Sequence, residues 1–169
     1  MQLTSARLDL REVALGAVST LRPLLDEKRQ CVQVEMPAPL SYGGDARRLE
    51  QVLVNLIANA HEHAPAGTNI AITGHVQPHE LIIEVFDDGP GIPAEEREHI
   101  FERFHRLAPT RRGSGLGLAI ARSIVQLHGG RIWAESASAT GVRFRLALPT
   151  DEAEVTQHAP EAARSRRRP

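Results

Sequence analysis

The chain has 169 residues, of which 41% are hydrophobic and 24% are charged, and its formal net charge is −1. These values are typical of one soluble globular domain that is long enough to bury a core. A net charge so close to zero argues against a general nucleic-acid binder, which would carry a basic surplus. The single cysteine, Cys31, excludes a disulfide framework and a cysteine metal site.

The sequence also indicates where the chain works. No apolar run approaches the roughly 20 residues that a membrane-spanning helix needs, and no signal peptide opens the chain. We therefore expect a cytoplasmic domain with no membrane contact of its own, which leaves open whether the full-length protein is anchored in the inner membrane. Cys31 lies in an alternating apolar run and is interpreted as a small buried hydrophobic residue. Lys28 is the only lysine.

Hydrophobic periodicity divides the first part of the chain into strands and helices. The expected elements are a strand within residues 3–10, a helix over 10–30, a strand over 31–36 and a helix over about 45–64. Pro23 is expected to kink or divide the first helix. Tyr42-Gly43-Gly44 is typical of a turn, and Asp45 is predicted to cap the helix that follows.

The second part of the chain contains more strands than helices. The expected elements are strands over 69–73 and 81–86, a short helix over 94–104, a helix over 114–127 and strands over 131–135 and 142–148. Ser114 is predicted to cap the last helix, and residues 108–113 are predicted to form a mobile loop. Residues 151–169 lose apolar content and end in arginines, so we expect a disordered tail.

These elements predict one α+β domain over residues 1–150. The link between the strands at 69–73 and 81–86, and the closing pair of strands, favour a mixed and mostly antiparallel sheet. We expect a two-layer sandwich in which about three helices cover one face of that sheet.

A polar stripe follows one face of the helix at 45–64. Gln51, Asn55, Asn59 and His63 recur every four residues, between the apolar positions of the same helix. Asparagine is a poor helix former, so two of them in a helix interior require an explanation. They are either hydrogen-bonded packing residues or a ligand wall whose amide oxygens meet a hydrated metal ion.

Two glycine-rich stretches follow. In Asp87-Asp88-Gly89-Pro90-Gly91, the glycines permit close approach to a planar ligand, and Asp87 suits an amine donor such as that of adenine; the alternative is an acidic surface turn. Gly113-Ser114-Gly115-Leu116-Gly117-Leu118 opens a helix and can offer backbone N–H groups to phosphates, or can simply be a flexible loop end. Its spacing does not match a Rossmann turn, and the chain has no Walker lysine.

The order of these stretches resembles the ATP-binding catalytic domain of sensor histidine kinases, in the family shared with DNA gyrase B, mismatch-repair ATPases and heat-shock chaperones. Asn55 and Asn59 match the family's N box, and Asp87, Gly89 and Gly91 match its G1 box. Phe101 and Phe104 match the F box, Gly113, Gly115 and Gly117 the G2 box, and Thr140-Gly141-Val142 the last glycine motif. The resemblance covers residues 8–149 and implies the Bergerat-type form of the α+β sandwich.

The resemblance implies that ATP and Mg²⁺ bind, with Asn55 and Asn59 as catalytic residues and Asn59 as the metal ligand. Asp87 would accept the adenine amine, Arg106 and Arg112 would contact phosphates from a lid, and the glycines of 113–117 would cradle them. The implied nucleotide-binding residues are Asn55, Asn59, His63, Asp87, Gly89, Gly91, Ile92, Phe101, Phe104, Arg106, Arg112, Gly113, Ser114, Gly115, Leu116, Gly117 and Leu118.

Position 55 distinguishes the members of the family. Relatives that hydrolyse ATP, and serine kinases, have a glutamate there as general base, whereas Asn55 cannot accept a proton at neutral pH. This favours phosphoryl transfer to a histidine, and none of the eight histidines here has the helical-hairpin setting of the family's acceptor. The expected partners are therefore the histidine-containing dimerisation domain of the same kinase and, indirectly, a response regulator. The isolated domain is expected to be an inactive monomer.

Two departures from the family pattern keep alternatives open. Glu62 replaces a usual lysine, and Val142 replaces a usual threonine. A carboxylate near a polyphosphate is repulsive, and valine forms no hydrogen bond. The alternatives are a degenerate nucleotide-sensing module, a slow ATPase and a serine kinase of the same fold.

Overall fold

The computed structural model describes residues 3–105, 115–136 and 141–150. Its helices are α1 (Leu10–Glu27), α2 (Ala46–His63) and α3 (Gly117–Leu127). Its strands are β1 (Ala6–Asp9), β2 (Cys31–Glu35), β3 (Ser41–Gly44), β4 (Asn69–Gln77), β5 (Glu80–Asp87), β6 (Arg131–Ser136) and β7 (Val142–Pro149). The predicted loop at 108–113 and tail at 151–169 lie outside the described residues.

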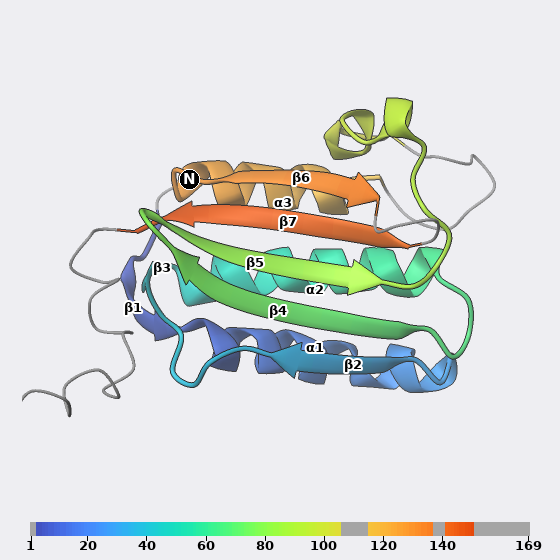
Figure 1. Ribbon diagram of the computed structural model, residues 1–169, viewed down its shortest axis with the longest axis horizontal. Coiled ribbons are helices and arrows are strands. Elements are labelled where there is room, and N and C mark those ends of the chain that lie inside the picture. Colours follow the sequence, from blue (N-terminus) through green and yellow to red (C-terminus); the bar gives the residue numbers. More distant parts are fainter. Residues whose placement is uncertain (1–2, 106–114, 137–140, 151–169) are drawn as a thin grey trace, which may run out of the picture.

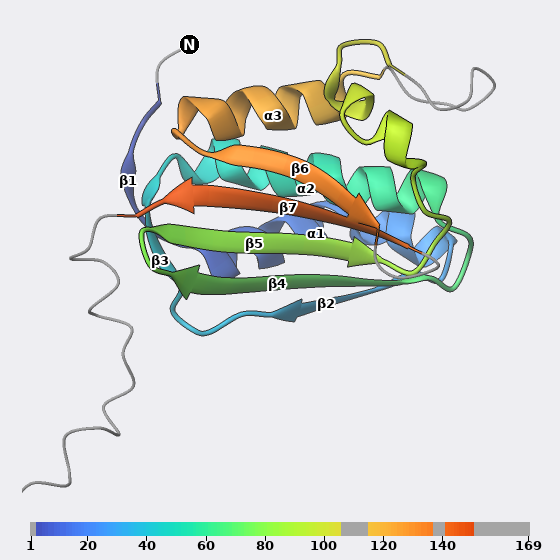
Figure 2. The same ribbon diagram turned by 45° about the horizontal axis from the view of Figure 1, so that its top comes forward.

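The predicted two-layer architecture is confirmed. Five strands form one sheet in the order β2-β4-β5-β7-β6, in which only the β2–β4 pair is parallel. All three helices lie on one face of this sheet (Figures 1 and 2). The ends of α1, α2 and β5 and the beginning of α3 lie at the same end of the molecule, on the right in Figure 1.

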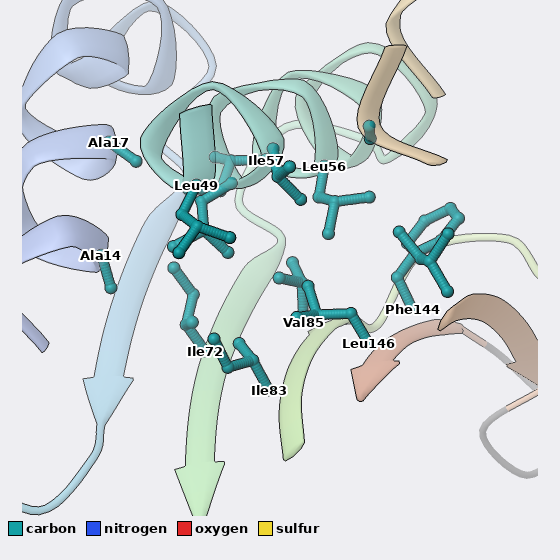
Figure 3. Packing of buried hydrophobic residues seen from close by; sticks show 14 of the residues in the cluster. Ala14, Ala17, Leu49, Leu56, Ile57, Ile72, Ile83, Val85, Phe144 and Leu146 are labelled. Atoms are coloured by element: carbon teal, nitrogen blue, oxygen red, sulfur yellow. The ribbon is translucent and has the colours of Figure 1, made fainter. Parts of the chain in front are cut away.

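The core fills the space between the helices and the sheet. Leu56 and Ile57 of α2 are fully buried and point toward β4, β5 and β7, whereas Ala14 and Ala17 lie on α1 beside α2 (Figure 3). Burying a leucine or isoleucine side chain stabilises a fold by about 1.5–3 kcal/mol. The apolar stripe of α2 therefore fixes which face of this helix remains for polar groups.

Asp45 caps α2 as predicted, and it also joins three segments. Its carboxylate accepts hydrogen bonds from the backbone N–H of Arg48 (3.1 Å) and of Thr4 (3.0 Å). Its own N–H donates to Nε2 of His128, 3.1 Å away, while Nδ1 of His128 lies 2.9 Å from the carbonyl oxygen of Ile124. His128 therefore carries its proton on Nδ1, and it holds the end of α3 against the beginning of α2.

Two predictions about local structure were wrong. Tyr42-Gly43-Gly44 is not a turn, because it pairs with β1 as part of β3 and buries Tyr42. Residues 94–104 form two 3₁₀ turns, Ala94–Glu96 and His99–Phe101, in place of one helix. Only Ile100 and Phe101 of these turns are buried, which is too small an apolar face to stabilise a longer helix.

Two boundaries and one environment also differ from expectation. The first helix ends at Glu27 and accommodates Pro23 without dividing, and the last helix begins at Gly117, after Leu116 and not after Ser114. Cys31 is exposed. Strand β2 alternates in such a way that Val32 and Val34 face the core, so Cys31 must face away from it.

None of the helices within residues 3–105, 115–136 and 141–150 is long and apolar enough to cross a membrane.

Candidate nucleotide-binding site

The polar face of α2 lies against the beginning of α3. Asn55 and Asn59 are half-buried, and the side-chain amide of Asn55 donates a hydrogen bond to the carbonyl oxygen of Gly117 at 3.0 Å. A Cβ atom at Gly117 would lie 3.8 Å from Asn55, which is ordinary contact. The structure thus brings Asn55 of the predicted N box and the last glycine of the predicted G2 box together. His63 lies half-buried in the last turn of α2.

Asp87 ends β5 in a nearly closed environment. Its side chain is 5% exposed, and Oδ1 accepts a hydrogen bond from the N–H of Gly89 at 3.0 Å. Burial, with a smaller contribution from the neighbouring charge of Asp88, raises the pKa of Asp87 to about 6 despite the opposing effect of the Gly89 hydrogen bond. Asp87 is therefore ionised at neutral pH, and it can gain a donor from a ligand that reaches it.

The backbone around Asp87 admits no side chains at two glycines. A Cβ at Gly89 would lie 2.8 Å from Oδ1 of Asp87 and 2.9 Å from Cβ of Ala64. At Gly141, where φ is +93°, it would lie 2.3 Å from the carbonyl oxygen of Asp87. Gly91 differs, because the nearest atom to its Cβ position, the carbonyl oxygen of Gly141, is 3.5 Å away. A Cβ atom at Gly91 would therefore make only ordinary van der Waals contact.

The two phenylalanines of the predicted F box have different roles. Phe101 is buried and contacts the edge of Phe144, with ring centroids 6.2 Å apart, so it belongs to the core. Phe104 is 71% exposed and has a positive φ of +63°. Its N–H donates to the carbonyl oxygen of Gly115 at 2.9 Å, and a Cβ at Gly115 would lie 2.9 Å from Cα of Phe104. Only glycine at position 115 therefore allows the two backbone segments to approach this closely.

The beginning of α3 has no side-chain cap. Leu116 occupies the N-cap position, and its side chain makes no capping hydrogen bond. The N–H groups of the first turn, including those of Gly117 and Leu118, therefore receive no acceptor from the N-cap side chain. Such a helix start is suited to a negatively charged group.

Several predicted site residues lie elsewhere. Arg106, Arg112, Gly113 and Ser114 lie outside the described residues. Ile92 is 9% exposed and packs with the core, and its carbonyl oxygen accepts a hydrogen bond from Nε of Arg97 at 3.2 Å.

The two departures from the family pattern also have places in the fold. Val142 is buried and lies opposite Asp87 in the β5–β7 register, so an apolar group sits where a hydrogen-bonding threonine is usual. Glu62 is half-buried in the last turn of α2, and its carbonyl oxygen lies 3.5 Å from Nζ of Lys28.

Sequence patterns missed Lys28 and Gln30, which contact the end of α2 from the segment after α1. No local motif marks them, and the only signal was that Lys28 is the only lysine. Across the described ranges, no group of three or more His, Cys, Asp or Glu side chains could hold a metal ion.

Comparisons with known proteins agree with this geometry. The family model described as "Histidine kinase-, DNA gyrase B-, and HSP90-like ATPase" matches residues 44–152. The chain is 38% identical over 154 residues to the adaptive-response sensory kinase SasA of Thermosynechococcus vestitus. The aligned region covers 88% of this chain and 40% of SasA. The chain thus spans about two fifths of this relative.

Solved structures show the same fold. The nucleotide-free catalytic domain of histidine kinase ThkA has a TM-score of 0.79 and 29% identity, covering 91% of this chain and 99% of that one. ThkA has also been solved in complex with the response regulator protein TrrA. Full-length ShkA in complex with AMPPNP has a TM-score of 0.79 and 26% identity, covering 88% of this chain and 32% of that one.

Three features occur in the order that the resemblance requires, in the fold that the solved kinases share. They are the polar face of α2 with its two asparagines, the glycine turn at Asp87 and the start of α3 without a side-chain cap. The chain belongs to the histidine kinase-, DNA gyrase B- and HSP90-like ATPase family, within which it is a catalytic ATP-binding domain of the sensor histidine kinase type.

Proposed function

We propose that this chain transfers the γ-phosphoryl group of ATP to a histidine on a separate helical dimerisation domain of the same kinase, from which a response regulator then receives it. The observation that carries this proposal is Asn55, whose amide donates to the carbonyl oxygen of Gly117. Asn55 cannot accept a proton at neutral pH, so position 55 offers no general base for attack by water. An imidazole nucleophile needs little deprotonation, which suits this arrangement.

The residues present fit a nucleotide and a metal ion. Asn59 would offer its amide oxygen to Mg²⁺, Asp87 would accept the exocyclic amine of adenine, and the first turn of α3 would receive phosphate oxygens. Bound Mg²⁺ would neutralise part of the phosphate charge, which is its usual contribution to phosphoryl transfer. The chain's own contribution is to hold base and phosphates at fixed positions at one end of the sheet.

A groove next to the beginning of α3 suits the acceptor domain. It has a volume of about 380 Å³ and lies between α2 and α3. Its lining residues are Arg48, Gln51, Arg103, Phe104, Leu116, Ala119, Ile120, Ser123 and Ile124. Phe104 is 71% and Ile120 38% exposed, so apolar surface faces outward one helical turn before Asn55. A helical hairpin seated there would bring its histidine toward the phosphate region.

The setting of the protein is part of the proposal. A domain of this kind works in the cytoplasm, reaches the response regulator through its dimerisation domain and binds neither nucleic acid nor membrane. By itself the chain lacks an acceptor, so it is expected to be monomeric and to turn over ATP slowly.

The proposal is tested by incubating the chain with γ-labelled ATP and Mg²⁺, alone and with the dimerisation hairpin of its parent kinase. We expect no labelling and slow phosphate release from the chain alone, and an acid-labile, base-stable label on the hairpin. Asn59→Ala, tested in parallel, should lose this transfer. Fast phosphate release by the chain alone would favour a hydrolase. Nucleotide binding without transfer to the hairpin would favour a nucleotide sensor.

A further inference from the structure

The segment that follows α1 forms hydrogen bonds to the end of α2, the helix that carries Asn55 and Asn59. Nζ of Lys28 lies 2.5 Å from the carbonyl oxygen of His61, 3.4 Å from that of Ala64 and 3.5 Å from that of Glu62. These carbonyls belong to the last turn of α2 and to its C-cap. The carbonyl groups at the end of a helix have no N–H partner within the helix. An ammonium group there satisfies them and interacts favourably with the negative end of the helix dipole.

Gln30 adds neutral hydrogen bonds to the same end of α2. Its side chain is 4% exposed, and Nε2 donates to the carbonyl oxygens of Pro65 (3.1 Å) and Ala64 (3.4 Å). Oε1 lies 2.7 Å from Nδ1 of His61. Because Oε1 of an amide can only accept, Nδ1 of His61 is the donor in this contact. Burial and the nearby Lys28 ammonium lower the pKa of His61. The backbone adds a bond from the N–H of Gly67 to the carbonyl oxygen of Lys28 at 2.9 Å.

The turn that Lys28 holds directly follows the metal-binding candidate, Asn59. Asn59 lies one position before Ala60, whose carbonyl oxygen accepts from the C-cap N–H of Ala64. Asp87, by contrast, is held by β5, which pairs with Ile70 of β4 and with Val142 of β7 at that position. The sheet thus holds the adenine side of the site and the end of α2 holds the metal side, and the two sides meet where Ala64 lies beside Gly89.

We propose that Lys28 is a positioning residue for phosphoryl transfer: by holding the last turn of α2, it sets the position of Asn59 relative to Asp87. This inference rests on the proposed function, because it assigns Asn59 to the metal and Asp87 to adenine. Lys28 acts through α2 and touches neither ligand. Because it is the only lysine of the chain, no other lysine can take its place.

The test compares Lys28→Met, which removes the charge but keeps an extended side chain, with Lys28→Arg, which keeps a cation. Affinity is measured for AMPPNP with Mg²⁺ and for ADP in EDTA. We expect Lys28→Met to weaken AMPPNP binding about tenfold and ADP binding less than about threefold, and Lys28→Arg to stay within about threefold for both. Arg131→Met, which breaks an exposed ion pair with Glu80 on the sheet, is the control and should change neither affinity.

Each other result has a defined meaning. Unchanged AMPPNP affinity in Lys28→Met overturns the proposal, and equal losses for both nucleotides reduce Lys28 to a general stabiliser, which also overturns it. If the unmutated chain binds neither nucleotide, the proposed function itself fails, and this result is distinguishable because it needs no substitution.

A second comparison covers the case in which Lys28→Met does not fold. Acetylating the folded chain removes the charge of its only lysine, whereas reductive methylation keeps that charge. We expect the acetylated chain to bind AMPPNP with Mg²⁺ about tenfold more weakly than the methylated chain, and Lys28→Arg to be insensitive to the acetylation. Equal affinities of the acetylated and methylated chains would overturn the proposal.

Discussion

The side-chain amide of Asn55 donates a hydrogen bond to the carbonyl oxygen of Gly117, 3.0 Å away, and so joins the middle of α2 to the first residue of α3. The two residues are 62 positions apart in the chain. One partner lies in the predicted N box and the other in the predicted G2 box, so the contact connects the asparagine face to the proposed phosphate site. An asparagine in a helix interior has here a structural reason as well as a proposed chemical one.

Replacing Asn55 with Ala should destabilise the domain modestly. A half-buried neutral hydrogen bond contributes about 1 kcal/mol, so we expect a melting temperature lower by about 3 °C. Thermal unfolding followed by circular dichroism measures this change. Gln51→Ala, one turn earlier on the same face, is the control, because its side chain accepts a hydrogen bond from Arg48 of the same helix, 3.4 Å away. Equal melting temperatures for Asn55→Ala and the unmutated chain would show that the contact contributes nothing.

Replacing Asn59 with Ala should remove the Mg²⁺ dependence of nucleotide binding. We expect the unmutated chain to bind AMPPNP more tightly with Mg²⁺ than in EDTA, and Asn59→Ala to bind with the same affinity in both. Titration calorimetry in the two buffers measures the difference, with Gln51→Ala as the matched variant on the same stripe. The metal assignment is wrong if the unmutated chain binds AMPPNP equally well in EDTA.

Replacing Asp87 with Asn should weaken ATP and ADP alike, because this residue is assigned to the base and not to the phosphates. Losing a charge-assisted hydrogen bond of this kind costs about 1.5–3 kcal/mol, or about ten- to hundredfold in affinity. Asparagine can still accept the N–H of Gly89, so the turn should persist. Asp88→Asn is the control, since Asp88 is exposed and accepts from the N–H of Asn69 at 3.1 Å. An ADP affinity unchanged by Asp87→Asn contradicts the adenine assignment.

The same substitution should stabilise the nucleotide-free domain in a pH-dependent way. Folding raises the pKa of Asp87 from an ordinary 3.8 to about 6, so the folded chain holds this proton more tightly than the unfolded chain does. Ionising Asp87 therefore costs stability as pH rises through this window, and above it the cost reaches about 3 kcal/mol. Below the ordinary value the cost vanishes.

Urea unfolding of Asp87→Asn and the unmutated chain, each at pH 5 and pH 7, isolates this effect from other titrating groups. We expect the stability advantage of Asp87→Asn to be larger at pH 7. An advantage that is the same at both pH values, or a loss of stability at pH 7, would show that burial does not raise the pKa of Asp87 in this way.

Local sequence patterns determined much of this protein. The four-residue recurrence of Asn55 and Asn59 depends only on helical geometry, and Asp45 caps its helix through a neighbour three residues away. The strands now assigned as β4 and β5 were predicted as neighbouring strands joined by a short link. The candidate site was predicted because its glycines and polar residues stand in a recognisable order, although Phe101 proved to be a core residue that packs on Phe144.

The tertiary structure decided everything that depends on a distant partner. Cys31 shares its face of β2 with Gln33 and Glu35, and the packing of Val32 and Val34 against the core shows that this face is the exposed one. Tyr42-Gly43-Gly44 is extended because β1 pairs with it, and no local signal in three such residues reveals that partner. Lys28 contacts carbonyl oxygens 33 to 36 positions away. A sequence motif shows which hydrogen-bonding groups a residue has. The partner of each group is set by the packing of α1, α2 and the sheet around one core.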